Sequence, residues 1–260
     1  MKRVLTTLAL IPFAVYSVFF APYWFFVAVA AAMAFLCYNE FSNLVRAHAI
    51  DEPGVLGAAA GFLLFVDIAY VRIVGLVALL SMLRISDLSL ALAHAASIVL
   101  GAVYIFGSWR CAIDLRSISP WWLFYALAIN WVGDIAALWV GKAIGRHKLA
   151  PRISPGKTIE GALGSMALAV VFGLILRYFA FPEFPVIYMI LLSVVANIAG
   201  QLGDLVESAI KRGAGVKDSG TSLPGHGGWL DRLDSSLFTL PTVFLILDFL
   251  ARHPNLLLTK

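Results

Sequence analysis

The sequence predicts an all-α, polytopic membrane protein, and three observations support this fold class. Hydrophobic residues make up 61% of the 260-residue chain and charged residues only 13%, whereas an ordinary soluble domain carries about 25% charged residues. Apolar runs near the length of a bilayer-spanning helix recur along the whole chain. Polar residues gather in a few short segments, the longest between Asn197 and Ser235. We therefore expect about nine transmembrane helices and one polar site at the cytoplasmic face.

Nine segments approach the ~20 apolar residues that a membrane-spanning helix needs. They are residues 4–21, 23–39, 54–71, 73–84, 88–107, 121–141, 161–181, 185–210 and 236–251. The basic start of the chain, Met1-Lys2-Arg3, resembles that of a signal peptide, but further apolar runs follow directly, so the first run is predicted to be an uncleaved transmembrane helix. We divide the chain into an N-terminal transmembrane region, 1–120, and a region, 121–260, that carries the polar motifs.

The distribution of lysine and arginine predicts which loops face the cytoplasm. With the N-terminus inside and nine alternating spans, 13 of the 19 basic residues fall on the inner side, as the positive-inside rule requires. The loops at 142–160 and 211–235 then share the cytoplasmic side. The net charge of +4 is modest and comes from these loops, so no nucleic-acid partner is expected. The two cysteines, Cys37 and Cys111, lie in or near apolar segments and are interpreted as packing residues.

A polar stripe marks one predicted helix near the end of the chain. Its members are three or four residues apart and therefore share one helical face. They are Asn197, Gln201, Asp204, Ser208 and Lys211, with Glu207 beside them. Such a stripe faces protein or water rather than lipid, because polar groups are costly in hydrocarbon.

A glycine-rich loop follows this helix. It contains the turn Pro224-Gly225-His226-Gly227-Gly228, where glycines let backbone N–H groups approach an anion closely. The next predicted helix begins with Asp231, Asp234 and Ser235 on one face. Carboxylates from two helices, basic residues and open backbone around one loop are typical of metal-assisted phosphate chemistry.

The same residues carry a family resemblance. The run Ser-x-x-Lys-Arg-x4-Lys-Asp-x5-Pro-Gly-His-Gly-Gly-x2-Asp-Arg-x-Asp, from Ser208 to Asp234, resembles the signature of the phosphatidate cytidylyltransferases, also called CDP-diacylglycerol synthases. Residues 148–161 resemble a second block of that family. Trp229 departs from the pattern, because the family usually has an aliphatic residue there. The motifs cover roughly the last half of the chain, whereas residues 1–120 resemble the family only in being hydrophobic.

The resemblance implies an activity and its partners. CTP and phosphatidic acid would give CDP-diacylglycerol and pyrophosphate, a step of phospholipid biosynthesis, in a bacterial inner (cell) membrane with the active site facing the cytoplasm. The catalytic region would then be 121–260. Because the lipid phosphate is already anionic, it needs no strong general base to attack CTP. Family resemblance alone also suggests a homodimer.

Asp204 and Asp231 are the predicted metal ligands. Mg²⁺ prefers carboxylate oxygens and usually takes one or two of them together with substrate phosphates, so it is the expected cofactor; a second cation stays open. The structural alternative is that both are helix-end carboxylates neutralised by Lys211 or Arg232. Asp134, four residues after Asn130 in the sixth predicted span, is expected to join the site; otherwise it makes an interhelical hydrogen bond.

The remaining site predictions fall into two groups. Residues expected to act in catalysis carry charge or can donate hydrogen bonds to phosphate; they are Lys217, Asp218, His226, Arg232 and Asp234. Asp218 and Asp234 are either further metal ligands or partners that orient the basic residues, and the same roles are open to Glu207. Residues expected to bind substrate lie in both motif blocks; they are Asp134, Ser154, Lys157, Thr158, Glu160, Ser208, Lys211, Arg212, Gly227 and Gly228. The alternatives are headgroup anchoring for the basic residues, above all Arg212, and a turn contact for His226.

The segment around Gly156-Lys157-Thr158 is not a P-loop. That motif needs a glycine five positions before Gly156, where Pro151 stands. Ser154 and Pro155 are instead predicted to be a helix N-cap and a first-turn proline.

Three other polar residues within predicted spans are given structural roles or positions at a span boundary, because no polar neighbours at helical spacing are expected for them. They are Asp67, His94 and Asp248. In the sixth span, by contrast, Gly133, Ala137 and Gly141 predict close contact with another helix.

Two other functions stay open on the sequence alone. A related CTP-using membrane enzyme, such as a polyprenol kinase or an archaeal-lipid cytidylyltransferase, would need a similar polar face, and a kinase would release CDP rather than pyrophosphate. A transporter is disfavoured, because transporter sites lie near the bilayer midplane between repeated halves. Here the charges cluster at one membrane face, and no internal repeat is evident.

Overall fold

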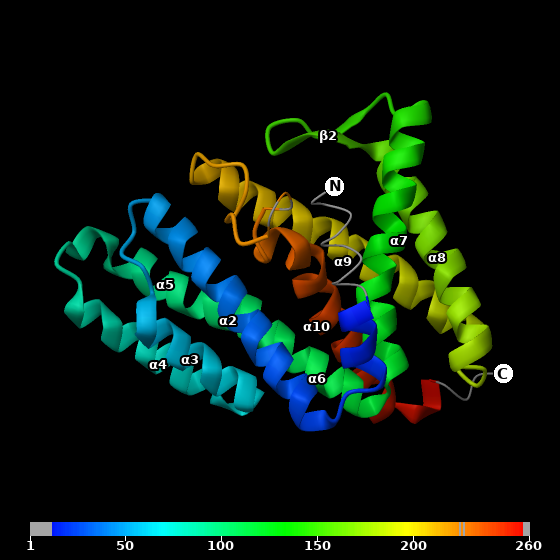
Figure 1. Cartoon of the computed structure of the whole chain (residues 1–260), viewed down its shortest axis with the longest axis horizontal. Coiled ribbons are helices and arrows are strands. Elements are labelled where there is room, and N and C mark those ends of the chain that lie inside the picture. Colours follow the sequence, from blue (N-terminus) through cyan, green and yellow to red (C-terminus); the bar gives the residue numbers. More distant parts are fainter. Residues whose placement is uncertain (1–11, 224, 226, 257–260) are drawn as a thin grey trace. The chain divides into compact units, whose positions relative to one another are not determined.

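The computed structural model describes residues 12–223, 225 and 227–256, and most of them are helical. The α-helices are α2 Tyr23–Ala47, α3 Gly54–Val66, α4 Val71–Ser81, α5 Ala91–Gly101, α6 Ser108–Ile118, α7 Pro120–Ile144, α8 Ile159–Ala180, α9 Val186–Gly213 and α10 Leu230–Arg252 (Figure 1). Short 3-10 helices cover Ile68–Tyr70, Met82–Arg84, Leu88–Leu90 and Pro254–Leu256, and a π-helix, Ala102–Gly107, joins α5 to α6. The β-strands are β1 Lys148–Ala150 and β2 Ser154–Thr158, which pair antiparallel.

Six of the described helices are long and apolar enough to span a bilayer, so the chain is an integral membrane protein. They are Tyr23–Ala47, Leu88–Ile118, Pro120–Ile144, Ile159–Ala180, Val186–Gly213 and Leu230–Arg252, and each matches one of the nine predicted spans. The first predicted span, 4–21, extends outside the described residues.

Two predicted spans, 54–71 and 73–84, are replaced by shorter helices, so the count of nine is not confirmed. Helix α3 has 13 residues and α4 has 11, less than the ~20 that a span needs. The break comes at Asp67, whose backbone is extended and whose Oδ1 accepts a hydrogen bond from Ala69 N at 2.8 Å. This carboxylate caps the 3-10 turn and ends α3.

The chain divides into two compact units, and each is described by itself. The first unit contains the residues up to Asp114 together with Ala209–Leu233; the second contains Leu115–Ser208 and the residues from Asp234 onward. The boundaries fall within α6, α9 and α10.

The first unit is a bundle of α2, α3, α4 and α5 with the π-helical segment (Figure 1). Its buried apolar cluster consists of Ala60, Leu64, Val74, Ala78, Ala95, Ile98 and Ala102. Helix α2 packs against the end of α5 and the π-helical segment that follows it, and a Cβ on Gly101, the last residue of α5, would lie 2.9 Å from the ring of Phe41. The Tyr38 hydroxyl donates to the Gly54 carbonyl oxygen at 3.1 Å, which joins α2 to the start of α3. The orientation of α2 is therefore defined by close packing on one side.

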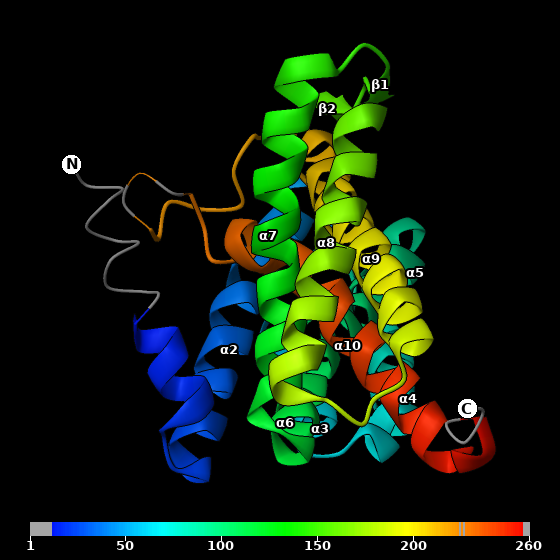
Figure 2. The same cartoon turned by 90° about the vertical axis from the view of Figure 1, so that its right-hand side faces the viewer.

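The second unit contains α7 and α8, which run side by side and are joined by the β1–β2 hairpin (Figures 1 and 2). Close packing depends on small residues, as predicted for Gly133, Ala137 and Gly141. A Cβ on Gly161 of α8 would lie 2.8 Å from the Ala137 carbonyl oxygen and 3.4 Å from Gly141 Cα. The prediction of close helix contact is confirmed.

Buried polar residues connect the helices of the second unit. Thr239 Oγ1 donates to Asn130 Oδ1 at 3.0 Å, and Asn197 Nδ2 donates to Ser165 Oγ at 2.9 Å. Gln201 Nε2 donates to Asn197 Oδ1 at 2.7 Å. Part of the polar stripe predicted on α9 is thus satisfied by other helices rather than exposed to lipid.

The structural roles predicted for three polar residues are confirmed. Asp67 caps a 3-10 turn, as described above. His94 is buried, with Nδ1 2.8 Å from the Asp51 carbonyl oxygen. Asp248 forms an ion pair with Arg252 at 2.9 Å. Arg252 is one helical turn later, so the expectation that Asp248 has no polar neighbour at helical spacing is wrong.

Candidate functional site

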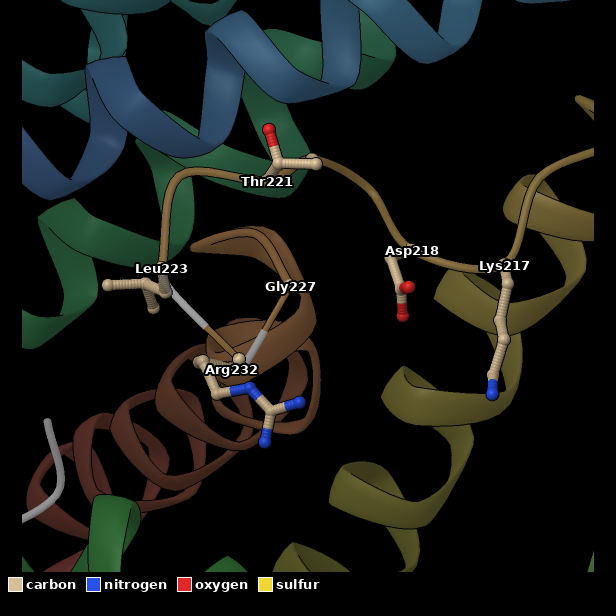
Figure 3. Close-up of a pocket in the computed structure, with 8 residues that line it drawn as sticks. Lys217, Asp218, Thr221, Leu223, Gly227 and Arg232 are labelled. Carbon is tan, nitrogen blue, oxygen red and sulfur yellow. The ribbon is translucent and has the colours of Figure 1, made fainter. Parts of the chain in front are cut away.

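The first cavity lies at the loop between α9 and α10, within the first unit. Its volume is about 480 Å³, and it is lined by Lys217, Asp218, Gly220, Thr221, Leu223, Gly225, Gly227 and Arg232. Figure 3 shows the side chains of Lys217, Asp218 and Arg232 extending into the same open space, two from the loop and one from the first turn of α10. Within the described residues none of these three forms an ion pair. Their charges are therefore available to a ligand.

Asp231 anchors this loop from the start of α10. Its Oδ1 accepts from Lys211 Nζ at 2.5 Å, and its Oδ2 accepts from the backbone N–H groups of Ser219 at 2.9 Å and Gly228 at 2.8 Å. The side chains of Lys211 and Asp231 are only 10% and 4% exposed. Gly227 has φ of +82°, and a Cβ there would lie 2.6 Å from Asp231 Oδ2. The turn therefore requires glycine at 227, both for its backbone conformation and for the approach of the carboxylate.

A second carboxylate, which is not among the residues predicted from the sequence, also contacts the loop. Glu40, near the end of α2, is 4% exposed and accepts hydrogen bonds from Ser219, Ser222, Trp229 and Leu230 at 2.8–3.0 Å. In the sequence Glu40 directly follows the predicted span 23–39, where a charge is expected at the membrane interface. Because Glu40 is more than 170 residues from the loop in the sequence, no local sequence pattern predicts this contact.

The other predicted residues near this loop have separate places. Arg212 is exposed, and its Nη1 donates to the Val216 carbonyl oxygen at 2.9 Å. Gly228 is buried and donates to Asp231 rather than lining the cavity. His226 lies outside the described residues.

The second cavity lies within the second unit. Its volume is about 230 Å³, and it is lined by Asp134, Ala137, Leu138, Leu149, Gly156, Lys157, Thr158, Gly161, Ala162, Ser165, Gln201, Asp204 and Ser235. Lys157 Nζ lies 2.5 Å from Asp204 Oδ2, and the two side chains are 27% and 30% exposed. Ser208 Oγ donates to Asp204 Oδ1 at 3.3 Å. Residues from both motif blocks, 148–161 and 208–234 with its preceding helix, thus line or contact one cavity.

The β1–β2 hairpin corrects one prediction of local structure. Ser154 is not a helix N-cap; it lies in β2 and pairs with Ala150. Helix α8 begins at Ile159, and the cap is Thr158, whose Oγ1 accepts from Gly161 N at 3.1 Å. A serine before proline suits an extended strand as well as a cap, because proline disfavours helical geometry in the residue before it.

Glu160 organises the hairpin from the first turn of α8. Its carboxylate accepts from the backbone N–H groups of Arg146 at 3.1 Å and His147 at 3.2 Å, and lies 2.6 Å from His147 Nδ1. These contacts define the base of the hairpin that presents Lys157. Asp234 Oδ1 accepts from the N–H of Ser235 at 2.6 Å.

The two cavities differ in the sign of their lining charge. Two cations and one anion line the first cavity, namely Lys217, Arg232 and Asp218. One cation and two anions line the second, namely Lys157, Asp134 and Asp204. The first cavity favours a phosphate group directly, whereas the second favours a cation, or a phosphate accompanied by one.

The donor set is compatible with Mg²⁺. Among the described residues no group of three or more His, Cys, Asp or Glu side chains is placed to hold a metal ion. Mg²⁺ does not need such a group, because it commonly takes one or two carboxylates and completes its shell with water and phosphate oxygens. Asp204 meets this requirement best, since it is 30% exposed and lines a cavity. Asp231 is 4% exposed and already accepts three hydrogen bonds.

Comparisons with known proteins agree on one family. The family model described as "Cytidylyltransferase family" matches residues 1–250. A phosphatidate cytidylyltransferase of Bacillus subtilis (strain 168) is 44% identical over 153 residues, and the match covers 58% of this chain but only 57% of that relative. A phosphatidate cytidylyltransferase of Staphylococcus haemolyticus (strain JCSC1435) is 33% identical over 228 residues, which cover 84% of this chain and 88% of the relative. One from Staphylococcus aureus (strain COL) matches with the same identity and coverage.

Proposed function

This chain belongs to the cytidylyltransferase family, and we propose that it transfers the cytidylyl group of CTP to phosphatidic acid. An oxygen of the lipid phosphate bonds to the α-phosphorus of CTP, the bond from that phosphorus to the oxygen leading to the β-phosphate breaks, and pyrophosphate leaves. The products are CDP-diacylglycerol and pyrophosphate. The relatives named phosphatidate cytidylyltransferase support this choice of substrates.

The observation that carries the proposal is the first cavity, with its available basic side chains. Lys217 and Arg232 extend into a space of about 480 Å³ whose wall is rich in glycine. Arginine binds phosphate in a bidentate manner and lysine acts as a point charge. We assign the phosphates of CTP to these two residues. They reduce the repulsion between two anionic substrates and stabilise the charge that develops on pyrophosphate.

The second cavity supplies the carboxylate for the metal in this proposal. Asp204 and Asp231 are the candidate ligands for Mg²⁺, and the exposure of Asp204 favours it as the principal ligand. When bound, Mg²⁺ supplies positive charge to phosphate oxygens. Lys157 neutralises Asp204 in the structure, and in the proposed role its ammonium group turns to a phosphate when the cation is present.

The proposal places the site at the cytoplasmic face of a bacterial inner (cell) membrane. The shortness of α3 and α4 does not alter this argument. If both fail to cross the bilayer, only Arg72, between them, changes side, and the loops 142–160 and 211–235 still share the side that holds most of the basic residues. A homodimer remains a prediction from family resemblance.

The test is a reaction with purified protein in detergent or in vesicles. Incubation with CTP, Mg²⁺ and phosphatidic acid is expected to release pyrophosphate and to form CDP-diacylglycerol in equal amounts. Diacylglycerol serves as the matched control lipid, because it lacks the attacking phosphate. Release of CDP in place of pyrophosphate would identify a kinase and contradict the proposal, as would the absence of any product.

A further inference from the structure

We infer that Glu40 is a positioning residue for the loop 219–230, which forms much of the first cavity. The inference rests on the proposed function in that it gives this cavity to CTP. It adds a residue from the N-terminal half of the chain, where the family signature has no counterpart, to the machinery that shapes the nucleotide site.

The contacts of Glu40 use the full accepting capacity of a carboxylate. Oε1 accepts from Ser222 Oγ at 2.8 Å and from the N–H of Trp229 at 3.0 Å. Oε2 accepts from Ser219 Oγ at 2.8 Å and from the N–H of Leu230 at 2.9 Å. Each oxygen has two lone pairs, so all four accepting positions are taken.

These bonds connect both ends of the loop to one side chain. Ser219 and Ser222 stand at its beginning, and Trp229 and Leu230 stand where α10 begins. The N–H groups at a helix N-terminus lack partners within the helix, and Glu40 supplies one from α2. Its negative charge also lies at the positive end of the α10 dipole. Within the described residues Glu40 forms no ion pair, so these four donors and the helix end compensate its burial.

The surroundings of Glu40 allow little adjustment. A Cβ on Gly220 would lie 2.8 Å from Oε1, and a Cβ on Gly228 would collide with Oε2 and with Ser219 Oγ. The loop approaches this carboxylate so closely that both positions have room only for glycine. Helix α2 is itself held by the packing of Phe41 and Tyr38 described above.

Ser219 links Glu40 to Asp231. Its hydroxyl donates to Glu40 and its backbone N–H donates to Asp231. Two carboxylates far apart in the sequence, Glu40 and Asp231, therefore both bind the loop at Ser219. The direct neighbours of Ser219 in the chain, Asp218 and Gly220, line the cavity. A change at Glu40 reaches the cavity through the backbone, without any contact between Glu40 and a substrate.

Glutamine is a demanding test of this role because it keeps the shape of glutamate but replaces one oxygen by an NH₂ group. Each oxygen of Glu40 accepts from one hydroxyl and one backbone N–H. A hydroxyl can turn and accept instead, but a backbone N–H cannot. In Glu40→Gln one N–H, of Trp229 or of Leu230, therefore faces another donor in either orientation of the amide.

The first experiment measures amide hydrogen exchange without substrate, in wild type, Glu40→Gln and Glu52→Gln. Glu52 is the matched control, because it lies in the same unit and pairs with Arg46 at the surface. We expect exchange in peptides covering 219–230 to be about 10-fold faster in Glu40→Gln, with peptides of α7 and α8 unchanged. Wild-type exchange of the loop in Glu40→Gln would overturn the inference.

The second experiment measures turnover in the same proteins. Glu40→Gln is expected to raise KM for CTP about 10-fold while KM for phosphatidic acid stays within about twofold, and Glu40→Asp is expected to recover part of the loss. An equal loss for both substrates, or none for either, would contradict the inference. If wild type forms no CDP-diacylglycerol, the proposed function fails, whereas the exchange data still decide whether Glu40 holds the loop.

A variant of Glu40 whose amides exchange rapidly throughout the chain has lost its fold. In that case two smaller substitutions test the inference. Ser222→Ala and Ser219→Ala each remove one hydroxyl donor and leave the carboxylate in place. We expect about threefold faster exchange in 219–230 for each. Unchanged exchange in both would overturn the inference.

Discussion

The two cavities are built in different ways. The first is formed by a loop, and its shape depends on carboxylates that accept backbone N–H groups, Asp231 and Glu40. The second is formed mainly by regular helices packed through small residues, with Lys157 presented by a hairpin. The loop cavity is therefore sensitive to single hydrogen bonds, whereas the helical cavity is sensitive to the distance between backbones.

The difference in charge between the two cavities indicates that they bind different parts of the substrate complex. The first cavity has a surplus of positive charge and the second a surplus of negative charge. In the proposed function the first holds phosphate by itself, and the second needs a cation to do so. Substitutions in the first cavity should therefore alter the affinity for CTP, and substitutions in the second should alter the dependence on Mg²⁺.

The largest effect is expected for Asp231→Asn. Turnover should fall at least about 10³-fold, because the loop loses its charged anchor. The variant should also be destabilised by about 3–5 kcal/mol, since the buried ion pair between Lys211 and Asp231 is broken. Turnover and thermal denaturation in detergent measure the two effects. Asp248→Asn, which breaks an ion pair near the other end of the same helix, is the control. Wild-type turnover in Asp231→Asn would refute the proposed role of Asp231 in the site.

Asp204→Asn sharpens the comparison from the side of the second cavity. We expect maximal turnover to fall about 100-fold and the Mg²⁺ concentration for half-maximal activity to rise about 10-fold or more. A titration of activity with Mg²⁺ measures both. Asp67→Asn changes a carboxylate that only caps a turn and should leave the titration unchanged. An unaltered Mg²⁺ requirement in Asp204→Asn would contradict the assignment of Mg²⁺ to this cavity.

Arg232→Ala tests the first cavity alone. The loss of a charge-assisted hydrogen bond to phosphate should raise KM for CTP about 10- to 100-fold and leave the Mg²⁺ requirement as it is. Arg252→Ala, near the other end of α10 and exposed, is the matched control. Steady-state kinetics with varied CTP measure KM. A changed Mg²⁺ requirement with an unchanged KM for CTP would contradict the assignment of CTP binding to the first cavity and of Mg²⁺ to the second.

The smallest effect concerns helix packing around the second cavity. A methyl group on Gly161 would press on the Ala137 carbonyl oxygen and on Gly141 Cα, so Gly161→Ala should destabilise the protein by about 1–3 kcal/mol. Gly75→Ala is the control, because a Cβ there meets nothing within 4 Å. Thermal denaturation compares them. Equal stability of both variants would show that α7 and α8 can accommodate a methyl group at Gly161 without cost.

Local sequence patterns predicted the features that depend on neighbours along the chain. Helical spacing placed polar residues on one face of α9, and the small residues of α7 marked the close contact with α8. The same reasoning failed at Ser154, because a Ser-Pro pair fits a strand as well as a helix start. It also failed at Asp67, where one carboxylate divides an apolar run by capping a 3-10 turn.

By itself the sequence determined the membrane class, the family and the contiguous loop motif, because composition, apolar run length and fixed spacing are properties of the chain in order. Only the tertiary structure decided that Lys211 belongs to Asp231, that Lys157 belongs to Asp204, and that Glu40 holds the loop. These partners are between 20 and 190 residues apart. Pairing over such separations follows from how helices pack, and no local pattern of residues encodes it.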